Sequence, residues 1–326
     1  MNTELLMPQR GRKYNPLPSA ILPDDLIIEI LSLLKVKSLM KMKCVSKSWK
    51  TLISDPKFVK MNLNQSSRNS HFYAVSYKNS KQKVDYSFLP FSINDLLDNR
   101  LINLPIDPYY RLIDKDCYKV VGSCNGLICL LSYSLTKDGN KETWCRLWNP
   151  ATRTISGKLG YFRDDMYQLE LCKYKFMFCY DTSTDTYKVV TLHPGNNSTT
   201  EVRVLSFGDN IWRNIQSFNA RPLQFFFPKN YGPHGGVHLN CTVNWLANIK
   251  EGDDFAYREL VIISLDVTTE THTQLLPPQV SLEDSLLQQG VCVLMSSLCF
   301  CHVIKGTDFV IWMMTEFGDN KSWTQF

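Results

Sequence analysis

The strongest constraint on the fold is a strand–turn–strand pattern that recurs along the C-terminal half of the chain. It occurs in LWNPATRTI (147–155), LSFGDNIWRNI (205–215), ISLDVTTETHTQL (263–275) and TEFGDNKSWTQF (315–326). The turns centre near Asn149, Asp209, Asp266 and Asp319, so successive turns are 60, 57 and 53 residues apart. A weaker fifth member with its turn near Ser80 spans residues 71–91. A fixed interval of this kind predicts a repeat architecture.

Further strand pairs precede the repeated hairpins. They are VVGSCNGLICLL (120–131), FMFCYDTSTDTYKVVTL (176–192), GVHLNCTVNWLA (236–247) and SSLCFCHV (296–303). Two hairpins in about 50–60 residues, repeated four or five times, are typical of a β-propeller, because one small sheet cannot bury both of its faces whereas stacked sheets can. We therefore predict an all-β, propeller-like domain over residues 63–326. The aspartates and threonines of its turns are interpreted as partners of turn backbone groups.

Residues 19–62 have a helical pattern instead, and residues 1–18 are predicted to be a flexible basic N-terminus. Pro23 and the acidic pair Asp24-Asp25 favour a helix start. Ser38 is predicted to cap a second helix with one apolar side, made of Leu39, Met42, Val45 and Trp49. Asp55-Pro56 predicts the start of a third helix. The expected fold class is α+β multidomain: three N-terminal helices followed by the β-domain.

The first predicted helix is more apolar than a single buried face requires. Seven of the nine residues from Leu26 to Leu34 are apolar, and a helix that packs one face on its own domain needs only an apolar stripe. Three short helices in about 40 residues rarely form a stable core unaided. The surplus surface is therefore expected to contact another protein. The alternative is that it packs on the second domain of the same chain.

The order and spacing of these residues resemble an F-box. The matching positions are Leu22-Pro23, Leu26, Glu29-Ile30-Leu31, Val36-Lys37-Ser38-Leu39, Cys44-Val45, Lys47-Ser48-Trp49, Leu52-Ile53, Asp55-Pro56 and Phe58. Lys35 departs from the pattern, because related plant sequences usually have proline there. The resemblance implies docking on a Skp-type adaptor, which links the chain to a cullin–RING ubiquitin ligase. The residues expected to bind the adaptor are Leu22, Pro23, Leu26, Ile27, Ile30, Leu31, Leu34, Leu39, Val45 and Trp49.

The strings GSCNGLICL, LWNPATRT, YDTSTDTYKVV and ISLDVTTE resemble the F-box-associated domain of plant F-box proteins, the group that includes the S-locus type. In that group the C-terminal domain binds the target protein. Three adjacent phenylalanines, Phe225, Phe226 and Phe227, cannot all point inward from one strand, so we expect at least one of them to contribute to target binding. The tryptophans at 148, 212, 245, 312 and 323 are expected mostly to pack between blades.

No active site is indicated. The histidines form no HExxH-like pair, glycine-rich phosphate loops are absent, and the Cys299, Cys301 and His302 group is interpreted as a core strand rather than a metal site. A Cys–His pair assembled by the fold stays open. We expect no catalytic residues, no metal and no cofactor. The 11 cysteines, an odd number at irregular spacing, predict reduced thiols in the cytoplasm or nucleus.

The charge distribution also favours two modules. Residues 1–60 hold 11 Lys and Arg against 5 Asp and Glu, whereas the whole chain has a net charge of +5. Eight lysines between 35 and 60 raise the alternative of a DNA-binding helix-turn-helix, but no Arg, Asn or Gln is grouped with them to read bases. The longest apolar run, 291–304, is too short to span a bilayer as a helix. We expect neither a nucleic-acid nor a membrane partner.

Together these features predict a substrate-recognition subunit of an SCF-type (Skp–cullin–F-box) ubiquitin ligase that is not itself an enzyme. The alternative is an F-box scaffold, or a protein- or glycan-binding module, that acts without a ligase. The last hairpin ends at Phe326, while similar family members continue for several dozen residues. We therefore expect an open or incompletely closed propeller with an unpaired edge near residues 309–326.

Overall fold

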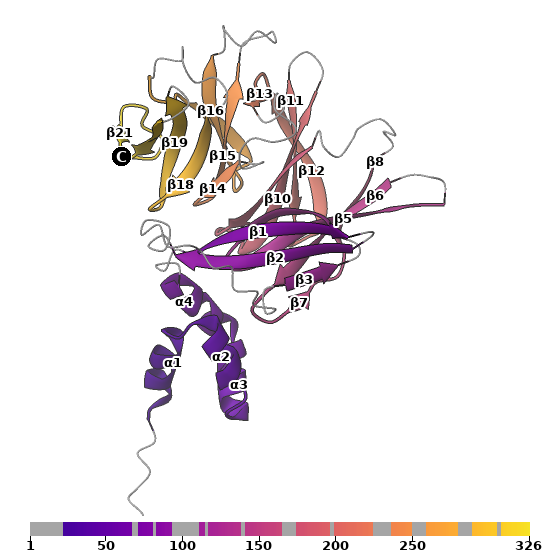
Figure 1. Cartoon of the computed structure of the whole chain (residues 1–326), viewed down its shortest axis with the longest axis vertical. Coiled ribbons are helices and arrows are strands. Elements are labelled where there is room, and N and C mark those ends of the chain that lie inside the picture. The colour runs from indigo at the N-terminus through magenta and orange to yellow at the C-terminus, as the bar shows by residue number, and fades with distance from the viewer. Residues whose placement is uncertain are drawn as a thin grey trace, which may run out of the picture. The chain divides into compact units, whose positions relative to one another are not determined.

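The chain divides into two compact units, Met1–Ser70 and His71–Phe326, and Figure 1 labels most of their helices and strands. This computed structural model describes residues 22–66, 71–80, 83–92, 111–114, 117–137, 141–164, 174–195, 199–223, 236–249, 259–279, 289–304 and 308–326. Where described, the first unit is helical and the second contains strands in antiparallel sheets. The predicted fold class is thereby confirmed.

Within residues 22–66, the helical unit contains four helices where the sequence predicted three. They are α1 (Asp24–Ser32), α2 (Val36–Met42), α3 (Lys47–Ser54) and α4 (Pro56–Ser66). The predicted second helix breaks after Met42, because Ser46 caps a new helix by accepting a hydrogen bond from the backbone N–H of Trp49 at 3.1 Å. Ser38 lies inside α2 rather than at its cap, and Val45 lies in the break, where its side chain is exposed. The prediction that Leu39 and Val45 lie on the same side of one helix is therefore wrong.

The core of this unit takes one fully buried apolar side chain from each helix. These are Leu31, Leu39, Ile53 and Phe58. As predicted, α4 starts at Pro56, where the Asp55 carboxylate accepts a hydrogen bond from the backbone N–H of Lys57 at 2.8 Å.

The described strands of the second unit form five antiparallel sheets, which follow one another along the chain. Sheet I consists of β1 (His71–Ser80), β2 (Lys83–Ser92) and β3 (Arg111–Asp114). Sheet II consists of β4 (Cys117–Cys124), β5 (Leu127–Leu135), β6 (Lys141–Asn149), β7 (Thr154–Ile155) and β8 (Leu159–Asp164). Sheet III consists of β9 (Lys175–Asp181), β10 (Thr186–Pro194), β11 (Thr200–Ser206) and β12 (Ile211–Phe218).

The remaining two sheets keep the same plan. Sheet IV consists of β13 (Arg221–Pro222), β14 (Val237–Leu239), β15 (Thr242–Asn248), β16 (Leu260–Asp266) and β17 (Thr271–Leu275). Sheet V consists of β18 (Gly290–Leu294), β19 (Ser297–Ile304), β20 (Asp308–Met314) and β21 (Trp323–Gln325). The four repeated hairpins read from the sequence are β6–β7, β11–β12, β16–β17 and β20–β21.

Alternating side chains bury both faces of the middle sheets. On β9, Phe176 and Phe178 join the core shared with sheet II, whereas Met177 and Cys179 join the core shared with sheet IV. A third core joins sheets IV and V, and Leu112 of β3 joins a fourth core with sheet II. Strand β9 contacts both β4 and β14, and β14 contacts β18. This sequential stacking is the packing predicted for a propeller.

The repeated FGDN strings make the same contacts twice. The side chain of Asn210 accepts a hydrogen bond from the backbone N–H of Gly160 in β8 of sheet II at 2.6 Å. The side chain of Asn320 accepts one from the backbone N–H of Leu276, the residue after β17 of sheet IV, at 2.8 Å. The indole N–H groups of Trp212 and Trp323 donate to the carbonyl oxygens of the same two residues, at 2.8 and 3.0 Å. These tryptophans therefore tie adjacent sheets together, and Trp148 and Trp245 are buried. The predicted packing role of the tryptophans is confirmed at these positions.

The described sheets do not close into a ring. Strand β1 pairs only with β2, and β21 pairs only with β20, so no described strand of sheet I pairs with sheet V. The predicted open arrangement is confirmed for these strands.

Candidate functional site

Helix α1 carries a stripe of exposed apolar side chains. Leu26, Ile30 and Leu33 follow the i, i+4, i+7 spacing that places side chains on one side of a helix, and they are 45%, 53% and 75% exposed. Leu22, just before the helix, is exposed as well. Large apolar side chains that line up in this way on a soluble module are typical of a protein-binding surface. We call Leu22, Leu26, Ile30 and Leu33 the α1 stripe.

The structure divides the predicted adaptor-binding residues into three groups by exposure. Leu22, Pro23, Leu26, Ile30 and Val45 are exposed, whereas Ile27, Leu34 and Trp49 are half-buried beside the helical core. Leu31 and Leu39 are fully buried core residues. Their assignment to an exposed adaptor-binding surface needs correction, because the neighbouring helices already cover them. For the exposed residues, adaptor binding stays a prediction.

Three exposed large apolar residues among the described residues of this unit were not among the predicted contacts. They are Leu33, Val36 and Val59. For Leu33 a signal was present, because it continues the spacing of Leu26 and Ile30. Val36 and Val59 carry no comparable periodic signal.

A polar contact between α1 and α4 fixes the end of the stripe. The buried side-chain amide of Asn62 donates to the carbonyl oxygens of Ser32 (2.7 Å) and Leu34 (3.1 Å), where the end of α1 leaves carbonyls without helical partners. The Ser32 hydroxyl donates to the side-chain oxygen of Gln65 at 2.8 Å. Asn62 of α4, which is 30 residues further along the sequence than Ser32, thus holds the C-terminal end of α1 in place.

Replacing Asn62 by alanine is expected to lower the stability of the helical unit by about 1–3 kcal/mol, because two carbonyl oxygens lose their donor near the core. The measurement is urea unfolding of the full chain followed by far-ultraviolet circular dichroism in the helical band. Lys50→Ala on the exposed side of α3 is the control, with an expected change within about 0.5 kcal/mol. Equal effects of the two changes would contradict the role given to Asn62.

In the β-unit, the hairpin turns share one polar design. Asn149, Asp181 and Asp266 each accept hydrogen bonds from the backbone N–H groups two and three residues later. In each turn two threonine hydroxyls then pair at 2.7 Å: Thr152 with Thr154, Thr184 with Thr186, and Thr269 with Thr271. The sequence interpretation as partners of turn backbone groups is confirmed for Asn149, Asp181 and Asp266, whereas the hydroxyls of these threonines pair with each other.

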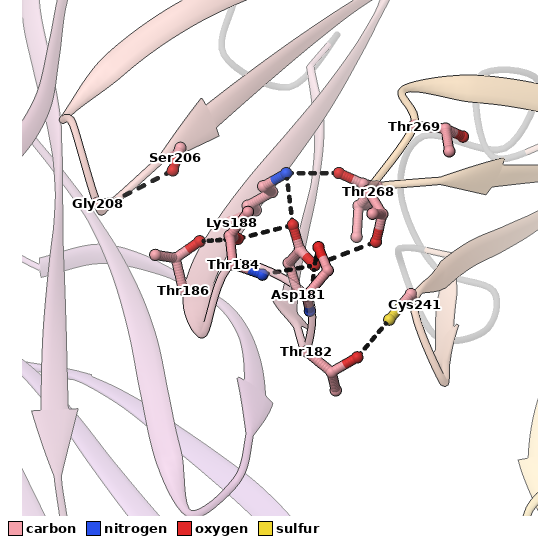
Figure 2. A network of polar contacts seen from close by, with 12 residues as sticks. Asp181, Thr182, Thr184, Thr186, Lys188, Ser206, Gly208, Cys241, Thr268 and Thr269 are labelled. Atoms are coloured by element: carbon pink, nitrogen blue, oxygen red, sulfur yellow. Dashed lines mark hydrogen bonds and ion pairs between the residues drawn. The ribbon is translucent and has the colours of Figure 1, made fainter.

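Asp181 has a further role, because it links sheets III and IV (Figure 2). Its fully buried carboxylate forms an ion pair with the Lys188 ammonium group at 2.9 Å and accepts a hydrogen bond from the Thr268 hydroxyl at 3.1 Å. Lys188 also donates to the carbonyl oxygen of Val267 at 2.5 Å. Burial alone would raise the pKa of Asp181, but hydrogen bonds from Ser183, Lys188 and Thr184 outweigh it and hold that pKa well below its ordinary value.

The fold does bring one cysteine and one histidine together. The Cys124 sulfur lies 4.0 Å from Nδ1 of His238. Burial raises the pKa of Cys124 to about 12 and lowers the pKa of His238, so both groups are neutral at pH 7. Nucleophilic catalysis by cysteine instead requires a thiolate, which an imidazolium commonly stabilises. This contact therefore provides no activated nucleophile.

Other predicted site features are as follows. Phe225, Phe226 and Phe227 lie outside the described residues. Across the described ranges, no three His, Cys, Asp or Glu side chains are grouped so that they could hold a metal ion. No helix in this part of the chain is long and apolar enough to cross a membrane.

The helical unit with its exposed apolar stripe and the unit of stacked antiparallel sheets together define a two-module protein. The comparisons agree with this class. The F-box domain model matches residues 20–61, and the model of the F-box associated beta propeller domain matches residues 97–326. The chain therefore belongs to the family of F-box proteins that carry an F-box-associated β-propeller domain.

Its relatives include two proteins of Arabidopsis thaliana. An F-box/kelch-repeat protein is 28% identical, with coverage of 93% of this chain and 78% of the relative. An F-box protein is 29% identical, with coverage of 92% and 89%. Among solved structures, the β-propeller domain of the Trilobed protease from Pyrococcus furiosus aligns at 8% identity and a TM-score of 0.33, with coverage of 76% of this chain and 82% of that chain.

This chain is thus a plant F-box protein. Proteins with an F-box and an F-box-associated domain in general serve as substrate-recognition adaptors of SCF complexes, in which the F-box binds a Skp-type adaptor. F-box proteins are generally non-catalytic.

Proposed function

We propose that this chain is the substrate-recognition subunit of an SCF-type ubiquitin ligase, with the α1 stripe docked on a Skp-type adaptor and the β-unit bound to a target protein. The observation that carries the proposal is the α1 stripe, because its aligned and exposed side chains belong to the module that the family uses for docking. The role is positional: the bound target is held at a high local concentration near the catalytic partners of the ligase.

The residues beside the stripe support the same arrangement. Asn62 fixes the end of α1 before any partner binds, so little ordering of the helix remains to oppose docking. Val45 and Val36 are also exposed and extend the apolar area of the unit. We propose a cytoplasmic or nuclear location, no nucleic-acid or membrane partner, and no catalytic activity of the chain itself.

The second candidate is an F-box scaffold, or a protein- or glycan-binding module, that acts without a ligase. Proximity labelling in plant cells, with and without a proteasome inhibitor, separates it from the ligase. A ligase subunit is expected to label a set of proteins that accumulates only when the proteasome is inhibited. A labelled set that does not respond to the inhibitor would support the scaffold and contradict the proposal.

A further inference from the structure

Three cysteines gather on one face of the β18–β19 hairpin. In the strand register, Cys292 lies directly opposite Cys299, and Cys301 lies opposite Gly290. Partners in register, and residues two apart on one strand, share a face of the sheet. All three sulfurs therefore lie on the same side of this hairpin, opposite the face whose Val291, Leu298 and Phe300 join the core with sheet IV.

Cys292 and Cys301 are diagonal neighbours on this face, and the Cys292 thiol lies close enough to those of both Cys299 and Cys301 to interact with them. The Cys301 sulfur also lies 3.4 Å from the carbonyl oxygen of Gly290, so its side chain reaches over β18.

The two thiols differ from Cys299 in access. Cys292 and Cys301 are half-buried, whereas Cys299 is fully buried. Interaction with Cys292 lowers the pKa of Cys301, interaction with Cys301 raises the pKa of Cys292, and burial raises the pKa of Cys299 to about 11. A partly accessible thiol whose pKa is lowered, with a second thiol beside it, is the usual setting of a redox-sensitive cysteine.

A second pair of cysteines in the chain serves as a comparison for Cys292 and Cys301. Cys129 of β5 and Cys145 of β6 are also diagonal neighbours, in the register Cys129–Leu147 and Leu131–Cys145, and their side chains are hydrogen-bonded. Both are fully buried in the core between sheets II and III, and burial raises the pKa of Cys129. Because neither thiol of this second pair is accessible to solvent, we expect Cys129 and Cys145 not to react with an oxidant.

We propose that Cys292 and Cys301 form a reversible disulfide when the protein meets a hydroperoxide. The Cys301 thiolate attacks the terminal peroxide oxygen, an S–O bond forms as the O–O bond breaks, and the alcohol leaves after taking up a proton. The Cys292 thiol then loses its proton and attacks the sulfenic sulfur, so that an S–S bond forms and water leaves. Two thiols and one hydroperoxide give one disulfide, one alcohol and one water, and a dithiol reductant reverses the change.

The test uses the full reduced chain treated with hydrogen peroxide, after which remaining thiols are blocked with N-ethylmaleimide. Chymotryptic cleavage at Leu294 or Leu298, together with cleavage after Phe300, separates all three cysteines, so that mass spectrometry of linked peptides identifies the pair. We expect a Cys292–Cys301 link that dithiothreitol removes, and no link between Cys129 and Cys145. A dominant link through Cys299, or no disulfide at all, would overturn the proposal.

Variants distinguish the two steps. Cys292→Ser is expected to stop the reaction at a sulfenic acid on Cys301, which dimedone traps, whereas Cys301→Ser is expected to lose both products. Cys299→Ala is the matched control on the same face and is expected to keep the disulfide. If Cys292→Ser leaves no trappable sulfenic acid on Cys301, or if Cys299→Ala abolishes the link, the assignment is wrong. The wild-type peptide map decides the pairing even if a variant fails to fold.

Discussion

Lys188→Met is expected to lower the free energy of unfolding of the β-unit by about 3–5 kcal/mol, because it leaves the Asp181 carboxylate buried without its ion-pair partner. It also removes the hydrogen bond to Val267 that helps to join sheets III and IV. Urea unfolding followed by tryptophan fluorescence measures the change, since Trp245 is buried in the core that these two sheets share.

Lys158→Met is the matched control for this prediction. Lys158 is exposed, and its ammonium group lies 3.8 Å from the centre of the Trp144 ring. Loss of this cation–π contact is expected to change stability by about 0.5–1 kcal/mol. A Lys188→Met effect no larger than that of Lys158→Met would show that the Asp181–Lys188 pair does not hold the two sheets together.

The lowered pKa of Asp181 predicts how the stability of the β-unit depends on pH. Because the pKa of Asp181 is lower in the folded state than in the unfolded chain, its contribution is fully present above the unfolded pKa, about 3.9, and is lost as the pH falls through the folded pKa. Asp181→Asn removes this contribution. The stability difference between wild type and Asp181→Asn is therefore expected to be constant near neutral pH and to shrink in acid.

Ile30→Asp is expected to weaken binding of the chain to a Skp-type adaptor by about 100-fold or more, because it places an unpaired carboxylate in an apolar contact at a cost of about 3 kcal/mol. Titration calorimetry with purified adaptor measures the change. The β-unit has its own cores and is expected to unfold as in the wild type.

Val59→Asp is the control, because Val59 on α4 is 50% exposed, close to the 53% of Ile30, but lies off the α1 stripe. It is expected to bind the adaptor nearly as the wild type does. Leu31→Asp is not an informative alternative, since Leu31 is 2% exposed and the charge would disrupt the helical core. Equal affinities of Ile30→Asp and the wild type would exclude the α1 stripe as the docking surface.

The repeats could be predicted because their signals are local. Turn residues such as Asn149 and Asp266 stabilise backbone within three residues of themselves, so their spacing alone located the four outer hairpins. The break between α2 and α3 was missed, although Ser46 was a readable cap, because the apolar periodicity continued across it.

Longer-range features could not be read from the pattern. Seven of the nine residues from Leu26 to Leu34 are apolar, so periodicity could not separate the core residue Leu31 from the exposed Ile30. That difference depends on how the other three helices pack on α1. The hydrogen-bond partners that complete the Asp181–Lys188 network, the Val267 carbonyl oxygen and the Thr268 hydroxyl, come from a turn about 80 residues later. Nothing in the local sequence of Asp181 or Lys188 indicates them.

The most direct test of the ligase assignment is co-purification of the full chain, expressed with an affinity tag in plant cells, followed by quantification of the Skp-type adaptor and the cullin. We expect both to co-purify with the wild type and with Val59→Asp, and both to be lost together with Ile30→Asp. Recovery of the adaptor without the cullin would contradict the ligase assignment and support the scaffold, and recovery of neither by the wild type would contradict both.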